Sequence, residues 1–205
     1  MATSPFKTAE ERAAERAAKH SAVLQAAVRM FNERGFNSTS LDDVAASLGI
    51  SKRTIYHYLS CKDQVLLECL TIGLNQLLKA AEDARDAPGT GRERLEEFLR
   101  RYAEISMEDF GRCVIRTGEE ALSPESIPPY RGFKRRIDHA MRDLIAQAVA
   151  DGSIAPVDVK IAAFTLAGAL NWTARWHEPE GSLSAQDIAA AMTGLLMQGL
   201  APRES

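Results

Sequence analysis

The chain has 205 residues, of which 45% are hydrophobic and 26% are charged, and its formal net charge is −3. This length and composition allow one or two globular domains with real cores. They exclude a membrane protein, because no apolar run approaches the roughly 18 residues that a span needs. The first 20 residues lack the apolar segment of a secretory signal, so we expect a cytoplasmic protein.

Helical spacing of apolar residues recurs along the chain, whereas sustained alternation bounded by hairpin turns does not occur. The sequence therefore predicts an all-α fold. The first helix is expected over residues 8–34, because Leu24, Val28 and Phe31 follow one another at intervals of four and three residues. Gly35 is expected to end it.

Three serines followed by an acid or a helix former mark the next helix starts. They are Ser40 with Asp43, Ser51 before Lys52, and Ser60 with Asp63. These signals divide residues 40–85 into two short helices and one long helix.

The remaining helices are separated by segments rich in Pro and Gly. We expect helices at about 92–109, 129–150 and 157–177, a less regular stretch around Gly111 and Gly118, and a last helix capped by Ser184 with Asp187. All eight prolines are expected in loops or tails, outside helices.

The two short helices carry the pattern of a helix-turn-helix. Ala45 is small where the helices must cross, Gly49 can adopt the left-handed turn conformation, and Ile55 faces inward. Two ordinary core helices are the alternative. The apolar positions that agree with the pattern are Leu41, Val44, Ala45, Leu48, Ile50, Ile55 and Tyr58.

The outward side of the second short helix combines cations, hydroxyls and aromatic groups suited to a DNA major groove. Arg and Lys can donate to guanine, Thr can contact a thymine methyl, and Tyr and His can donate to phosphates. Side chains at flanking helix starts suit phosphate oxygens. Solvated surface is the alternative for each residue. The predicted DNA-contacting residues are Thr39, Ser40, Ser51, Lys52, Arg53, Thr54, Tyr56, His57 and Lys62.

Residues 23–66 resemble the tetracycline-repressor (TetR) family of bacterial transcriptional regulators. The resemblance rests on "AA" before "MF", "GF" then "TS", "DVA", "GIS", and "IYHYL" followed by "KD". It implies a DNA-binding head at residues 1–63, a ligand-binding and dimerisation body at 64–205, a homodimer, and repression of a palindromic operator relieved by a small molecule. Cys61 departs from the serine or small polar residue common among relatives.

The stretch "AGALNWTARWHEPEGSLSAQDIA" resembles a subset of the family that controls catabolism of fatty acids, steroid fragments and other acids handled as coenzyme A thioesters. The resemblance implies an acyl-CoA thioester as the effector. No resident cofactor or metal is expected, because the three cysteines show no metal-ligand spacing.

The helix at 157–177 is apolar nearly all round and must be covered on two sides. We expect its small-residue side, with Ala163, Leu170 and Ala174, to pack with the last helix against a two-fold copy, forming a homodimer through the last two helices. A well-covered monomer core is the alternative.

The opposite side of that helix carries Trp172, Arg175 and Trp176, which we predict to bind the ligand together with Arg116. An Arg on an apolar face needs a partner, either Glu119 or Glu120 or an anionic ligand. A further cationic run, consisting of Arg131, Lys134, Arg135 and Arg136, could meet phosphates or form a solvated helix face.

An enzyme is the rival class, but a metal-binding His pair, a phosphate-cradling Gly loop and a nucleophile turn are missing. A second rival is a ligand-binding or interaction protein with a non-functional head. The sequence favours a DNA-binding regulator, and we predict no catalytic residue.

Overall fold

The computed structural model describes residues 8–59 and 61–199 and is all-α, as predicted, with no strand in those ranges. None of the helices in those ranges has the length and apolar character needed to span a bilayer. The elements are α1 Ala9–Arg34, α2 Leu41–Ser47, α3 Lys52–Tyr58, α4 Lys62–Asp86, α5 Gly91–Met107, α6 Asp109–Arg116, the 3-10 helix η1 Glu119–Ala121, α7 Ile127–Ala150, α8 Val159–Trp176 and α9 Ala185–Gln198.

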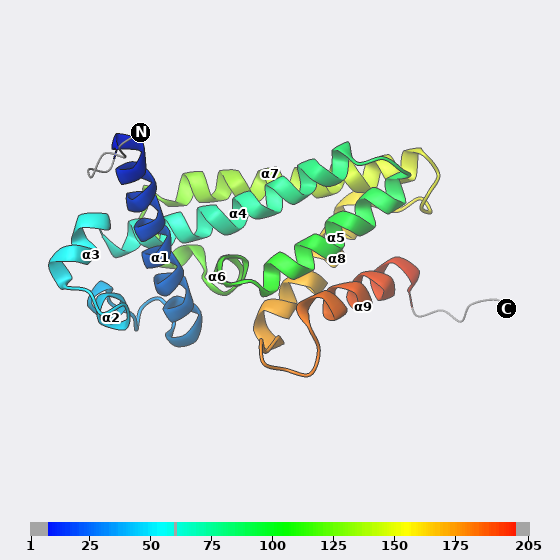
Figure 1. The fold of residues 1–205 in the computed structure, drawn as a ribbon. Helices are drawn as coiled ribbons and strands as arrows, with labels where there is room; N and C mark the ends of the chain where they lie inside the picture. The colour runs from blue at the N-terminus through cyan, green and yellow to red at the C-terminus, as the bar shows by residue number, and fades with distance from the viewer. Residues whose placement is uncertain (1–7, 60, 200–205) are drawn as a thin grey trace, which may run out of the picture.

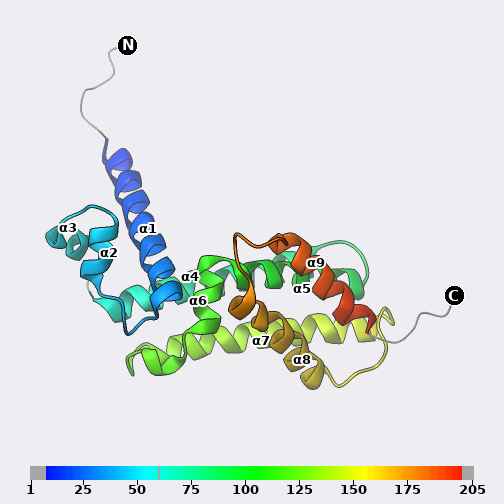
Figure 2. The ribbon, with the colours of Figure 1, turned by 90° about the horizontal axis from the view of Figure 1, so that it is seen from below.

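The helices form a small head and a larger body (Figure 1). The head consists of α1, α2 and α3, and the body of α5 to α9. Helix α4 leaves the head and runs along the body beside α7. Seen from below, α2 and α3 lie at the end of the molecule far from α9 (Figure 2). The described N-terminal helix therefore belongs to the head, and the last helix to the opposite end.

Hydroxyl caps explain why several helices begin where they do. Ser40 and Asp43 form a reciprocal capping box, and the Ser51 and Ser184 side chains accept from the amides of Thr54 and Asp187, as predicted. Ser60 lies outside the described residues. Cys61 occupies the cap position of α4 without a side-chain cap bond.

Asp63, the acid of the predicted Ser60 cap, also makes a contact outside its own helix. Its carboxylate accepts hydrogen bonds from the Ser123 amide at 2.7 Å, the Ser123 hydroxyl at 3.1 Å and the Ser126 hydroxyl at 2.9 Å. Asp63 thus joins the first turn of α4 to the segment that precedes α7.

The helix-turn-helix has the predicted core. Val44, Ala45 and Ile55 are at most 2% exposed, and Gly49 has φ 65°, a turn conformation that favours glycine. Because Ile55 packs α3 against the core, the residues on the opposite side of α3 face outward.

Two predictions about local structure are wrong. Pro128 and Pro129 lie inside the first turn of α7, where a missing N–H costs nothing because those amides have no intrahelical partner. The segment around Gly111, expected to be irregular, is the regular helix α6.

Glycines let α6 approach its neighbours closely. A Cβ built on Gly73 of α4 would lie 2.6 Å from the Phe110 carbonyl oxygen, and one on Gly111 would overlap the Ile105 carbonyl oxygen. Larger residues would push α6 away from α4 and α5. The lack of a side chain at these two positions therefore determines where α6 lies.

Asp109, the first residue of α6, ties the body to the head. Its carboxylate accepts from Gln25 Nε2 at 2.6 Å and from Arg29 Nε at 3.0 Å, and its carbonyl accepts from Asn32 Nδ2 at 2.8 Å. The three donors lie on successive turns of α1. A movement of α6 must therefore pull on α1 or break these bonds.

We predict that Gly111→Ala lowers the free energy of unfolding by about 1–3 kcal/mol, as overpacking does in a filled core. Gly132→Ala is the control: nothing lies within 4 Å of its Cβ, and Ala in a helix interior gains roughly 0.5–1 kcal/mol over Gly. Urea unfolding at matched protein concentration measures both. Equal stability of the two variants would contradict the close approach of α6.

Candidate nucleic-acid interface and internal cavity

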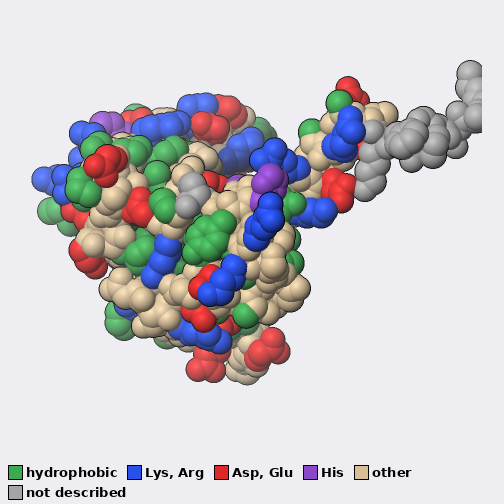
Figure 3. Space-filling view, turned by 90° about the vertical axis from the view of Figure 1, so that its left-hand side faces the viewer, with side chains coloured by type: hydrophobic (Ala, Val, Ile, Leu, Met, Phe, Trp, Pro, Cys, Tyr) green, Lys and Arg blue, Asp and Glu red, His purple; other side chains and the backbone are tan. Residues whose placement is uncertain are grey.

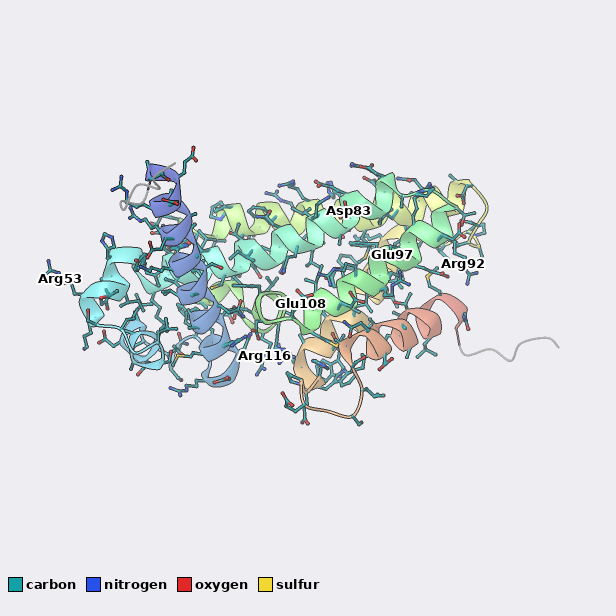
Figure 4. All side chains as sticks on the ribbon, in the orientation of Figure 1. Arg53, Asp83, Arg92, Glu97, Glu108 and Arg116 are labelled. Atoms are coloured by element: carbon teal, nitrogen blue, oxygen red, sulfur yellow. The ribbon has the colours of Figure 1, made fainter. Side chains whose placement is uncertain are left out.

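Helix α3 presents an exposed surface at the end of the head. Arg53 and His57 are exposed, and Tyr56 keeps 53% of its surface in solvent. Arg53 extends away from the protein (Figure 4) and makes no hydrogen bond or ion pair with the described residues. These side chains are free to contact another molecule, as predicted from the helical period.

The other predicted α3 residues already have partners. Lys52 Nζ lies 2.5 Å from an Asp42 carboxylate oxygen, whose hydrogen bond and charge raise the pKa of Lys52. The hydroxyls of Ser51 and Thr54 lie 2.8 Å apart, and the Ser51 hydroxyl also caps the helix. Contact with DNA would require Lys52 to exchange a carboxylate for a phosphate or a base.

The residues that flank α3 differ in accessibility. Ser40 is exposed at the start of α2, and Lys62 lies with its Nζ 4.2 Å from the centre of the Phe36 ring. Partial burial lowers the pKa of Lys62. Thr39, however, is only 2% exposed and its hydroxyl donates to the Gly35 carbonyl at 2.9 Å, so it stabilises the turn after α1 instead of facing solvent as expected.

A shallow depression of about 460 Å³ brings several of these residues together. Tyr56, Ser40 and Lys62 line it together with the exposed Cys61. Figure 3 shows this end of the molecule, where Lys and Arg side chains are interleaved with Asp and Glu. The described part of this face therefore has no uniformly basic patch, and a phosphate backbone would meet single cations on it.

The body contains a partly open cavity of about 350 Å³ between α4, α5, α6, α7 and α8. This volume falls in the range of small-molecule sites. Most of its wall is apolar. The apolar lining residues are Leu74, Leu77, Val114, Ile115, Ile137, Met141, Ala163, Phe164 and Ala167.

A few polar groups interrupt this wall. The Tyr102 hydroxyl donates to Asn171 Oδ1 at 3.0 Å, and burial raises the pKa of Tyr102 to about 12, so the phenol stays neutral. Lys134, Glu119 and Asp138 also line the cavity. A ligand that is largely apolar with a polar or charged end would match this lining.

The four residues predicted to bind the ligand do not line this cavity. Arg116, Trp172, Arg175 and Trp176 are exposed and none lines the cavity. Arg116 projects outward at the end of α6 (Figure 4). Because Arg175 is exposed it needs no buried partner, and Glu119 pairs with Arg131 instead.

The small-residue side of α8 is therefore not the free surface that the sequence predicted. Ala163, Leu170 and Ala174 pack into the protomer's own core, each at most 2% exposed. The aromatic side faces solvent, with Phe164 59% and Trp172 62% exposed. The small-residue side expected to meet a second copy is already covered.

Sequence reasoning missed Tyr102, Asn171 and Glu119 as cavity residues. Tyr102 and Asn171 are polar positions on helix faces that are otherwise apolar, and this signal could have marked them. Their meeting depends on the packing of α5 against α8, which no local pattern contains.

A second contact connects α6 to the end of α8. An Arg112 terminal nitrogen lies 2.8 Å from His177 Nδ1 and donates to the Met107 carbonyl at 3.0 Å. Partial burial, followed by the charge of Arg112, lowers the pKa of His177. A neutral imidazole accepts from the guanidinium, whereas a protonated one would repel it.

A helix-turn-helix with a free outer surface, carried on a helical body with a cavity, defines the class of ligand-responsive DNA-binding regulators. Among the described residues no cluster of His, Cys, Asp or Glu forms a metal site.

Family profiles agree with this class. Residues 23–69 match bacterial regulatory proteins of the tetR family, and residues 88–200 match the tetracyclin repressor-like C-terminal domain. Together with the shared fold, these matches show that the chain belongs to the TetR family of transcriptional regulators.

Individual relatives cover nearly the whole chain. The transcriptional repressor KstR2 of Mycolicibacterium smegmatis is 26% identical over 90% of this chain and 91% of its own length. The TetR-family regulator PfmR of Thermus thermophilus superposes with a TM-score of 0.80 at 30% identity, covering 88% of this chain and 99% of PfmR. AibR, solved in complex with isovaleryl coenzyme A and operator DNA, superposes with a TM-score of 0.76 at 26% identity. The match covers 87% of this chain and 97% of AibR.

We predict that Arg53→Ala weakens binding to the cognate operator by about 1–3 kcal/mol, the usual loss of a good base contact. Arg100→Ala removes the same charge from the exposed side of α5 and should leave affinity unchanged. Fluorescence anisotropy at fixed salt measures both, with thermal melting as the folding control. Equal affinities would remove Arg53 from the interface.

We predict that stability falls as pH drops below about 6.5. The folded pKa of His177 is depressed, so the unfolded chain binds more protons in the window between the folded and unfolded values. His177→Gln keeps an acceptor for Arg112 but does not titrate. Urea unfolding at pH 7.5 and 5.5 should show a larger loss for the wild type than for the variant, and parallel losses would contradict this.

Proposed function

We propose that the protein is a homodimeric repressor that binds a palindromic operator through two copies of α3 and is released by a small effector. The single observation that carries the proposal is the exposed outer side of α3, with Arg53, Tyr56 and His57, on a chain of the TetR family. Two such helices would enter successive major grooves about 34–36 Å apart.

The exposed apolar surface of α8 and α9 supports the homodimer. Large contiguous apolar patches are uncommon on monomers and mark interaction sites. Two copies of this surface, related by a two-fold axis, would bury it in a four-helix contact. It consists of Ile161, Phe164, Trp172, Trp176 and Leu195. The helices are those predicted from sequence, but the side of α8 is the opposite one.

The body cavity is the proposed effector site. Val114, Ile115 and Thr117 of the α6 region form part of its wall, and Asp109 at the other end of α6 is bonded to α1. A ligand that shifts α6 would move α1 and change the separation of the two heads. The ligand must bind this second conformation more tightly, and operator DNA must in turn weaken ligand binding.

An acyl-CoA thioester is the proposed effector class. The resemblance of residues 167–189 to regulators of CoA-thioester catabolism supports it, as does the likeness to AibR, whose structure contains isovaleryl coenzyme A. The apolar cavity is suited to an acyl chain. The same proposal includes a DNA-binding head at residues 1–63 and a ligand-binding and dimerisation body at residues 64–205. It also includes a cytoplasmic location and no catalytic activity.

The test is fluorescence anisotropy of the protein with the DNA upstream of its own gene, beside a scrambled duplex at the same salt, with and without acyl-CoA thioesters. We expect preferential binding that a thioester releases. If the protein prefers the upstream DNA but no thioester releases it, the effector is not an acyl-CoA thioester. A protein that prefers none of a wider set of promoter fragments would favour the rival, a ligand-binding protein with a non-functional head.

We predict that Trp172→Glu converts the dimer into a monomer and abolishes operator binding, because a charge would be buried in the apolar contact. Asn75→Glu introduces the same charge on the exposed side of α4 and should leave the dimer intact. Sedimentation velocity gives the mass of each. A Trp172→Glu variant that remains dimeric would exclude this surface as the dimer contact.

A further inference from the structure

The cavity in the body has a charged mouth. Lys134 lines the cavity and also a second, external depression of about 460 Å³, so the two adjoin at this residue. Arg131, Arg135 and Pro128 complete the external depression. Four residues of the first turns of α7 thus place three cations directly outside an apolar cavity.

The sizes of the two spaces suit the two parts of a coenzyme A thioester. A cavity of about 350 Å³ can take an acyl chain but not the nucleotide as well, since drug-sized ligands already fill sites of roughly 300–1,000 Å³. The nucleotide must then lie outside. Its phosphates need cations, and Arg and Lys bind phosphate through charge-assisted hydrogen bonds.

Two of these cations have partners in the free protein, since Lys134 Nζ lies 5.3 Å from the centre of the Tyr130 ring and Arg131 is paired with a carboxylate. Arg131 holds the Glu119 carboxylate through two hydrogen bonds of 2.9 and 2.6 Å. Both side chains remain largely exposed, at 60% and 42%, so solvent screens the pair and a more highly charged anion can displace Glu119. Arg131 in turn keeps the pKa of Glu119 below its usual value.

We propose that the cluster Arg131, Lys134 and Arg135 binds the phosphates of a coenzyme A thioester, and that these phosphates displace Glu119 from Arg131. This inference rests on the proposed function, because it takes the effector class from there. The exchange releases η1, which holds Glu119 and follows α6 by way of Thr117 and Gly118 of the cavity wall. The nucleotide thereby acts on the same helix as the acyl chain.

Isothermal calorimetry with isovaleryl-, hexanoyl- and octanoyl-CoA, each beside the S-acyl pantetheine that lacks the nucleotide, tests the site. Lys134→Ala and Arg135→Ala should each weaken the CoA thioester about tenfold or more, the usual loss of a charged hydrogen-bond partner. The pantetheine thioester should bind all variants equally. Arg136→Ala is the control, since Arg136 is exposed on the same helix but lines neither space.

Glu119→Gln tests the exchange of partners. It removes the competing charge, so CoA thioesters should bind several-fold more tightly, whereas Glu120→Gln, a change of the same kind at the next residue, should have no effect.

Three other results would overturn the inference. If the thioesters bind but Lys134→Ala, Arg135→Ala and Arg136→Ala behave alike, the phosphate site is wrong while the effector class stands. If Glu119→Gln and Glu120→Gln behave alike, the exchange is wrong. If no thioester binds the wild type, both the site and the effector class fail, but operator binding, measured separately by anisotropy, is untouched.

Discussion

The position of α6 is the constraint on which the rest of the molecule depends. Its first residue accepts three hydrogen bonds from α1, and Gly73 of α4 and Gly111 of α6 allow backbone contact of α6 with α4 and α5. A carboxylate at a helix N-terminus is also favoured by the helix dipole. The other end of α6 leads into the cavity wall. The same eight-residue helix therefore supports the head, fills the angle between two long helices and faces any molecule that enters the body.

Charge is distributed so that different surfaces can respond to different anions. In the head, Lys52 is held by Asp42 while Arg53 has no partner among the described residues, so one cation is restrained and the other is free. In the body, Arg131 is held by Glu119 while Arg135 is free in the same sense. Exposed pairs of this kind contribute little stability. In the function proposed above, they would hold these side chains near the anion that displaces the carboxylate.

The helices and the helix-turn-helix could be predicted because local signals determine them. Ser40, Ser51 and Ser184 cap their helices with their own hydroxyls, and Ile55 is forced inward by the helical period. The cavity could not be predicted, because its wall comes from five helices distant in sequence. The orientation of α8 also failed, since a helix that is apolar all round gives no signal for which side meets its own core. Small side chains pack against neighbouring helices inside the protomer, which left the tryptophans outside.

The continuity of α4 gives the head a mechanical property. Its 25 residues form one helix of roughly 37 Å without a break between head and body. A rigid rod of that length works as a lever: a tilt of about 5° at the body end would carry the other end through roughly 3 Å, close to the 3.4 Å between stacked base pairs. Sub-ångström movements around a bound ligand would therefore become movements of α3 that are comparable to the spacing of base pairs.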